Sequence, residues 1–159
     1  MVYVFLANGF EEMEAIAPID LLRRAELKVV TVAVGTDTTM VTGAHGVRIH
    51  ADITEQQIDF TGIEMAVLPG GMPGTLHLEQ STVVQTVLKH CKQQNIQIGA
   101  ICAAPSILGH MELLHGITAT CFEGFETQLT GANYSPQHVC CDQNIITARG
   151  AGVSVEFAL

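Results

Sequence analysis

The feature that most constrains this sequence is a regular alternation of short apolar runs with longer stretches of helical periodicity. Four apolar runs have the length of buried strands: 2–7, 28–34, 65–71 and 96–101. Helix-prone segments stand between or after them: 11–27, 81–94 and 104–114. Parallel strands joined by right-handed helical crossovers account for this order. We therefore predict an α/β fold with a mostly parallel sheet and helices on both faces.

Shorter patterns complete the expected fold. Residues 39–52 predict a hairpin around two glycines, and 116–120 and 144–150 predict late strands. The composition suits a sheet covered on both faces, because 48% of the residues are hydrophobic and only 14% are charged. With 159 residues, the chain is expected to form one domain, 1–159.

Charge and cysteine usage exclude several classes of protein. The net charge is −9 and only seven residues are Lys or Arg, so we expect neither nucleic acid nor an acidic membrane surface as a partner. No apolar run reaches the roughly 18 residues of a membrane-spanning helix, and the first residues lack the basic segment of a signal peptide. Five cysteines without a C-x-x-C pair indicate free thiols in a reducing compartment. We predict a cytoplasmic protein.

The strand ends indicate where a site would form. Parallel α/β sheets bind ligands at the carboxyl ends of their strands, near a reversal of strand order. In this chain the residues that follow strands are 8–14, Gly70 with Gly71, Cys102 and those after Thr120. Candidate functional residues are therefore sought in these segments.

Cys102 stands between an apolar strand and a helix, which is the arrangement of a nucleophile elbow. Small neighbours at 99–100 and 103–104 permit a tight turn. The N–H groups at the start of the following helix are expected to lower the pKa of the thiol and so favour the thiolate. The alternative is a structural cysteine packed in the core, which is common. The residues alone leave both interpretations open.

Two further strand ends offer groups that suit a reactive thiol. The backbone N–H groups of Gly70 and Gly71 suit an oxyanion site, although the pair is equally typical of an ordinary tight turn. Glu14 lies three residues after Glu11 and is able to point inward over the strand ends, where it would share a proton with sulfur. The alternative is that these acids only stabilise the helix dipole.

The remaining reactive side chains form no motif in the sequence. His45 and His50 are an odd number of residues apart and would face opposite sides of a strand, so no metal site is expected from them. The neighbours Cys140 and Cys141 would likewise point apart and are interpreted as packing residues. Arg149 ends a late strand and is interpreted either as an anion contact or as a solvated end.

Four segments in a fixed order form a combination that no single motif provides: FEEMEAIAPIDLLRRA, VLPGGMPGTLHL, GAICAAPSILG and ARGAGVSVEFAL. Together they resemble the signatures of the DJ-1/ThiJ/PfpI superfamily over essentially the whole chain. The resemblance is strongest to the ThiJ-like branch, that of the Parkinson's-linked deglycases.

The resemblance implies a flavodoxin-like α/β sandwich, a homodimer and an elbow cysteine, Cys102, that can be oxidised to sulfinate. It implies Glu14 as a protonated partner of the sulfur. Backbone N–H groups of Gly71 and Ala103 would bind the oxyanion, beside Gly70. No metal and no organic cofactor are expected.

The chain also departs from the family pattern. Phe122 occupies the position at which many members have histidine, which puts histidine-assisted hydrolysis in doubt. Ala103 replaces the histidine that follows the nucleophile in the peptidase branch, which argues against a peptidase. Members continue past the segment EFAL as a C-terminal helix, so we expect the domain 1–159 to lack that helix.

Two functions remain open at this stage. The first is a stress-protection enzyme of the glyoxalase or deglycase type, in which Cys102 attacks methylglyoxal, glyoxal or their glycated adducts. The second is a redox-sensing cysteine protein or holdase chaperone without true turnover, in which Cys102 is oxidised.

Overall fold

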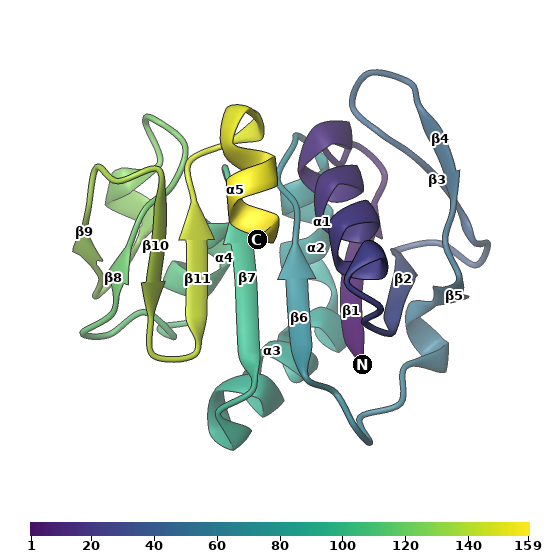
Figure 1. The fold of residues 1–159 in the computed structure, drawn as a ribbon, viewed down its shortest axis with the longest axis horizontal. Helices are drawn as coiled ribbons and strands as arrows, with labels where there is room; N and C mark the ends of the chain where they lie inside the picture. The colour runs from purple at the N-terminus through teal and green to yellow at the C-terminus, as the bar shows by residue number, and fades with distance from the viewer.

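A seven-stranded sheet forms the centre of the computed structural model, which describes residues 1–159 (Figure 1). Its order is β10-β11-β7-β6-β1-β2-β5, and every neighbouring pair is parallel except β10 with β11. The strands are β1 (Val2–Ala7), β2 (Val29–Val34), β5 (Ile53–Thr54), β6 (Met65–Leu68), β7 (Gln97–Ile101), β10 (Val139–Asp142) and β11 (Ile145–Ala148). The predicted α/β class and mostly parallel sheet are confirmed.

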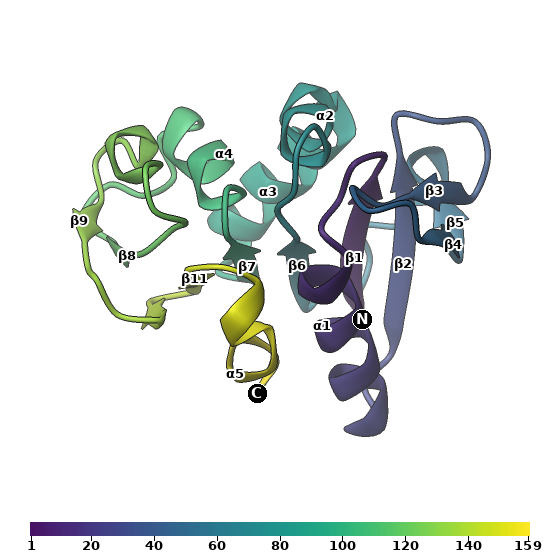
Figure 2. The ribbon, with the colours of Figure 1, turned by 90° about the horizontal axis from the view of Figure 1, so that it is seen from above.

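Helices cover both faces of this sheet, as Figure 2 shows from above. One face carries α1 (Glu12–Arg24) and α5 (Ser154–Ala158). The other carries α2 (Gly74–Gln80), α3 (Thr82–Gln94) and α4 (Pro105–His110). The doubly covered sheet explains why the central strands are apolar on both sides.

The side chains of β1 alternate between two hydrophobic clusters, one on each face of the sheet. Tyr3, Phe5 and Ala7 belong to the larger hydrophobic cluster, which also contains buried side chains of α3 and α4. The intervening residues Val4 and Leu6 belong to the second cluster, with buried residues of α1 and α5. Successive side chains of a strand point to opposite faces, so a continuous apolar run fills both layers.

The strand order reverses at β1. The chain passes from β1 to β2 on one side and later returns to β6 on the other side of β1. The carboxyl ends of β1 and β6 therefore flank the reversal, where ligands bind in open α/β sheets. Residues 8–14 and Gly70–Gly71 follow these two strands, so the fold brings together segments that are distant in the sequence.

The smaller elements match the sequence in part. The hairpin is confirmed as β3 (Met40–Thr42) paired antiparallel with β4 (Arg48–His50). The strand expected over 116–120 exists only as β8 (Thr118–Ala119), and it pairs outside the main sheet with β9 (Asn133–Tyr134). The sequence patterns do not reveal α2, β5 and β9, and they suggest β10 only through the pair Cys140–Cys141, because these elements are short or begin among glycine and proline residues.

The helices are shorter than their sequence patterns. Helix α1 ends at Arg24, and Glu26 then has a positive φ of 62°. Helix α4 ends at His110, and Glu112 has a φ of 58°. A left-handed residue does not continue an α-helix. Helix α3 begins as predicted, because the Ser81 hydroxyl caps it by accepting a hydrogen bond of 3.1 Å from the Val84 N–H.

Cys140 and Cys141 lie on β10 and point to opposite sides, as expected, since the first is buried and the second exposed.

None of the helices combines the length and the hydropathy that a membrane crossing would require.

Candidate active site

Cys102 directly follows β7 and adopts a strained backbone conformation. Its φ is 65°, in the left-handed region that non-glycine residues rarely occupy. Hydrogen bonds hold it from two sides: its N–H donates to the Ala148 carbonyl at 2.9 Å, and its own carbonyl accepts from the Phe122 N–H at 2.8 Å. The side chain is half-buried. This is the geometry of the elbow that the sequence indicated.

Glu14 lies in the first turn of α1 and points into the protein. Its N–H donates to Oε2 of the N-cap residue Glu11 at 2.8 Å, which fixes the start of the helix. The Glu14 side chain is only 1% exposed. Its Oε2 accepts a hydrogen bond of 2.8 Å from the N–H of Gly70, which follows β6.

The Glu14 carboxyl group and the Cys102 thiol meet on either side of Gly70. A Cβ atom placed on Gly70 would lie 2.7 Å from Cβ of Cys102 and 2.7 Å from Oε2 of Glu14. Only a glycine therefore fits between them. The carboxyl group and the thiol are close enough for each to shift the pKa of the other.

Backbone amides approach the sulfur from two loops. The N–H groups of Gly71 and Ala103 lie near the sulfur and act to lower the pKa of the thiol. Gly71 has a φ of 91°, and glycine adopts this conformation without the cost that a Cβ would add. The sequence predicts that the Gly70 amide serves the oxyanion, and this prediction is wrong, because the amide donates to Glu14.

The pKa values of the pair differ from the expectation for an elbow cysteine. Burial raises the pKa of Glu14 from 4.5 to about 7. Burial and then the negative charge of Glu14 raise the pKa of Cys102 to about 12. The helix that follows, α4, has only six residues and does not offset these effects. At neutral pH the pair of Glu14 and Cys102 therefore accommodates one negative charge and one proton.

Phe122 borders a cleft next to this pair. The cleft has a volume of about 360 Å³ and is lined by Phe122, Glu123, His138, Arg149, Gly150, Ala151, Gly152 and Val153. The Ala151 N–H lies near the Glu14 carboxyl group and acts to lower its pKa. Gly150 and Ala151 belong to no sequence motif of the site, although their position after β11, at the carboxyl edge of the sheet, is a signal for them.

Glu11, Glu12 and His45 form the only compact group of metal-ligand type, with one ligand atom of each within 4.8 Å of the others. The Glu12 carboxylate accepts from the His45 backbone N–H at 2.7 Å and pairs with His45 Nδ1 at 2.8 Å. These contacts fasten the β3–β4 hairpin to α1. An ion pair thus accounts for the group, and His50 has no part in it.

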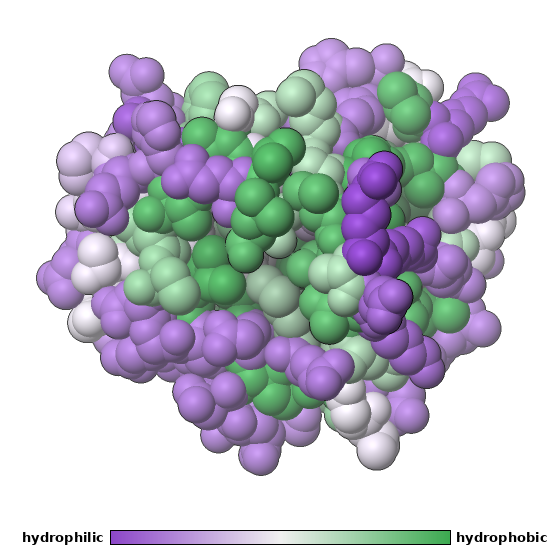
Figure 3. All heavy atoms as spheres, viewed as in Figure 1, coloured by the Kyte–Doolittle hydropathy of each residue, from purple (hydrophilic) through white to green (hydrophobic).

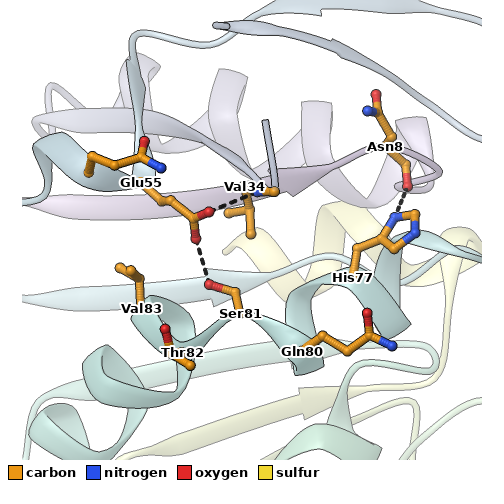
Figure 4. Close-up of a pocket in the computed structure, with 10 residues that line it drawn as sticks. Asn8, Val34, Glu55, His77, Gln80, Ser81, Thr82 and Val83 are labelled. Atoms are coloured by element: carbon orange, nitrogen blue, oxygen red, sulfur yellow. Dashed lines mark hydrogen bonds between the residues drawn. The ribbon is translucent and has the colours of Figure 1, made fainter. Parts of the chain in front are cut away.

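A larger polar cavity lies elsewhere at the carboxyl edge of the sheet, as Figure 4 shows. It has a volume of about 520 Å³, and Glu55 spans it by accepting from the Gly35 N–H at 2.9 Å and from the Ser81 hydroxyl. None of the residues around Cys102 lines it. Although this cavity is larger than the cleft beside Phe122, it is not the site of the thiol chemistry.

A doubly covered parallel sheet with a strained cysteine, a buried carboxyl group and two facing amides defines the class of α/β proteins with a cysteine elbow. The family model described as the DJ-1/PfpI family matches residues 1–159. The chain belongs to this family, as the sequence signatures indicated.

Curated relatives agree with this assignment. The chain is 37% identical over 160 residues to the Parkinson disease protein 7 homolog of Danio rerio, covering 98% of this chain and 84% of that protein. It is 37% identical over 159 residues to Protein DJ-1 homolog B of Arabidopsis thaliana, covering 99% of this chain but only 36% of that protein. It is 34% identical over 154 residues to a Caenorhabditis elegans protein named Glutathione-independent glyoxalase DJR-1.2, with 94% and 79% coverage.

Solved structures show the same fold. Oxidized DJ-1 of Toxoplasma gondii superposes with a TM-score of 0.94 at 35% identity, covering 99% of this chain and 85% of that one. The C103A mutant of the DJ-1 superfamily protein STM1931 from Salmonella typhimurium gives 0.93 at 31% identity, with the same coverage.

Proposed function

We propose that this chain is a cofactor-independent, stress-protective enzyme of the glyoxalase or deglycase type. Cys102 is its nucleophile and methylglyoxal, glyoxal or their adducts are its substrates. The observation that carries the proposal is the buried contact between Glu14 and Cys102, with the Gly71 and Ala103 amides at the sulfur. The relative named a glutathione-independent glyoxalase supports the same reaction class.

The reaction begins with a proton transfer within the pair. The thiol proton moves to the Glu14 carboxylate as the sulfur attacks the aldehyde carbon and forms a C–S bond. The oxygen of the former aldehyde becomes negative and is stabilised by the N–H groups of Gly71 and Ala103. Glu14 then returns the proton to this oxygen, which gives a hemithioacetal on Cys102.

The later steps use the same carboxyl group. For methylglyoxal, the Glu14 carboxylate removes the hydrogen from the carbon bonded to sulfur and delivers it to the neighbouring carbonyl carbon through an enediol. The product is a lactoyl thioester. Water then cleaves the C–S bond, which releases lactate and the free thiol, so the reaction adds one water in total and needs no external oxidant or reductant.

Methylglyoxal turnover by Cys102 and Glu14 variants tests the proposal. Cys102→Ser is expected to abolish turnover. Glu14→Gln is expected to lower kcat by roughly a hundredfold or more, the usual contribution of a positioned acid–base group. Full activity of Cys102→Ser would overturn the assignment of the nucleophile.

A second candidate function is redox sensing, with or without chaperone activity. The half-buried thiol, the facing amides and a carboxyl group that can donate a hydrogen bond also suit a cysteine sulfinate. Two equivalents of peroxide convert the thiol to sulfinic acid and release two waters. Intact mass after mild peroxide treatment would then increase by two oxygens in wild type and not in Cys102→Ala, with no accompanying aldehyde turnover.

We also propose that the chain forms a homodimer through the apolar face of α1 and α5. Met13 and Val155 are 59% and 58% exposed, and they line a groove of about 470 Å³ with Ile16. Figure 3 shows apolar side chains gathered on this face. A Met13→Glu variant is expected to run as a monomer in size-exclusion chromatography with light scattering.

The cytoplasm is the location that we propose for this protein, because its five free cysteines suit a reducing compartment.

A further inference from the structure

We propose that the cleft beside Phe122 is a subsite for an aromatic substituent of the substrate, so that Phe122 selects aryl α-oxoaldehydes over methylglyoxal. The inference rests on the proposed function of Cys102 and Glu14 and deepens it by naming the substrate class. It concerns a residue that takes no part in the bond-forming steps.

The Phe122 ring lies beside the reactive pair. A Cβ atom placed on Gly150 would lie 3.3 Å from Cδ2 of Phe122 and 3.9 Å from Oε1 of Glu14. The ring and the carboxyl group therefore approach the same backbone position. The cleft that the ring lines therefore adjoins the buried carboxyl group through Gly150.

A backbone hydrogen bond holds Phe122 at the elbow, while its side chain stays accessible. The Phe122 N–H donates to the Cys102 carbonyl at 2.8 Å, which ties the residue to the elbow itself. The side chain is 50% exposed, so half of the ring surface is free to contact a ligand. A ring whose backbone is held at the elbow and whose side chain is accessible offers a stacking surface for an aromatic group.

The rest of the cleft suits a flat group. Gly150, Ala151 and Gly152 contribute little side chain, and a Cβ atom on Gly152 would meet nothing within 4 Å. Arg149 also lines the cleft, and guanidinium groups stack on aromatic faces as well as donating hydrogen bonds to carbonyl oxygens. The volume of about 360 Å³ is at the lower end of the range for small-ligand sites.

The test compares kcat/KM for phenylglyoxal and methylglyoxal in wild type, Phe122→Ala and a matched control, Phe60→Ala. Phe60 is 37% exposed but packs against His90, away from the cleft. Phe122→Ala is expected to lower kcat/KM for phenylglyoxal roughly threefold to tenfold, the range that one aromatic pair contributes. The ratio of kcat/KM for phenylglyoxal to that for methylglyoxal is therefore expected to fall in Phe122→Ala and to be unchanged in Phe60→Ala.

A second readout does not depend on turnover. The rate of Cys102 alkylation is measured with iodoacetamide and with its N-benzyl derivative. The ratio of the benzyl rate to the unsubstituted rate is expected to fall in Phe122→Ala and to be unchanged in Phe60→Ala.

The outcomes separate this inference from the proposed function. Wild-type turnover of both aldehydes with an unchanged substrate ratio in Phe122→Ala would overturn the subsite and leave the proposed function standing. Absence of turnover in wild type would overturn the function, and the alkylation ratio would then decide the subsite alone: a fall supports it and no change overturns it.

Discussion

The N–H of Gly70 donates a hydrogen bond of 2.8 Å to Oε2 of Glu14, and this contact joins the loop after β6 to the first turn of α1. It places a carboxyl group from one segment beside a thiol from another. The site therefore depends on a residue without a side chain as much as on the two that carry the chemistry.

The first prediction concerns this glycine. In Gly70→Ala the new Cβ would lie 2.7 Å from both Cys102 Cβ and Glu14 Oε2, so the pair must separate. We expect a loss of about 1–3 kcal/mol in the free energy of unfolding, the cost of overpacking, together with slower alkylation of Cys102. Gly152→Ala is the control, because its Cβ meets nothing within 4 Å. Equal stability of the two variants in urea unfolding would refute the close approach.

The second prediction is a pH dependence of stability. Burial raises the pKa of Glu14 from 4.5 to about 7, so the folded protein holds this proton more tightly than the unfolded chain. The resulting stability is fully present below pH 4.5 and is lost as the pH rises through about 7. Relative to Glu14→Gln, the free energy of unfolding of wild type should fall by about 3 kcal/mol over this interval. A difference between the two proteins that does not vary with pH would contradict this prediction.

The third prediction concerns the thiol. The negative charge of Glu14 raises the pKa of Cys102, in addition to the larger effect of burial. Glu14→Gln removes the charge, so the apparent pKa from the pH dependence of alkylation should decrease. Burial remains, and we expect the value to stay above the ordinary 9.0 of a thiol. A higher pKa in Glu14→Gln would instead mean that the protonated carboxyl group stabilises the thiolate.

The fourth prediction concerns the ion pair that holds the hairpin. The hydrogen bond and charge of Glu12 raise the pKa of His45 above 6.5. In Glu12→Gln the pKa of the imidazole should decrease toward the ordinary value of 6.5. NMR titration of the His45 ring measures this directly. An unchanged titration curve in the variant would show that the pair does not form in solution.

The fifth prediction uses two buried threonines. The Thr120 hydroxyl is buried and has no hydrogen-bond partner, whereas the Thr147 hydroxyl accepts from the Thr120 N–H at 2.9 Å. Thr120→Val removes an unpaired polar group and should be neutral or stabilising, whereas Thr147→Val leaves a buried N–H unpaired and should cost about 1–3 kcal/mol. Thermal or urea unfolding of the two variants gives the comparison, and the reverse order would contradict it.

Local patterns were sufficient for the main elements of the fold. The apolar run of β1 and the amphipathic run of α3, with its Ser81 cap, were readable because hydrophobic periodicity and capping involve residues close in sequence. The same holds for the elbow, since a strand, Cys102 and a proline-started helix are contiguous. Short elements such as α2 and β5 lacked enough residues to show a period.

The sequence by itself determined the parallel sheet, the elbow and the segments that follow its strands. Only the tertiary structure decided that Gly70 holds Glu14 instead of an oxyanion, that burial raises the pKa of the thiol, and that Phe122 meets Gly150. Each of these depends on which strands are neighbours and on how deeply a group is buried. Such long-range contacts and desolvation arise from the packing of distant segments, which no local pattern specifies.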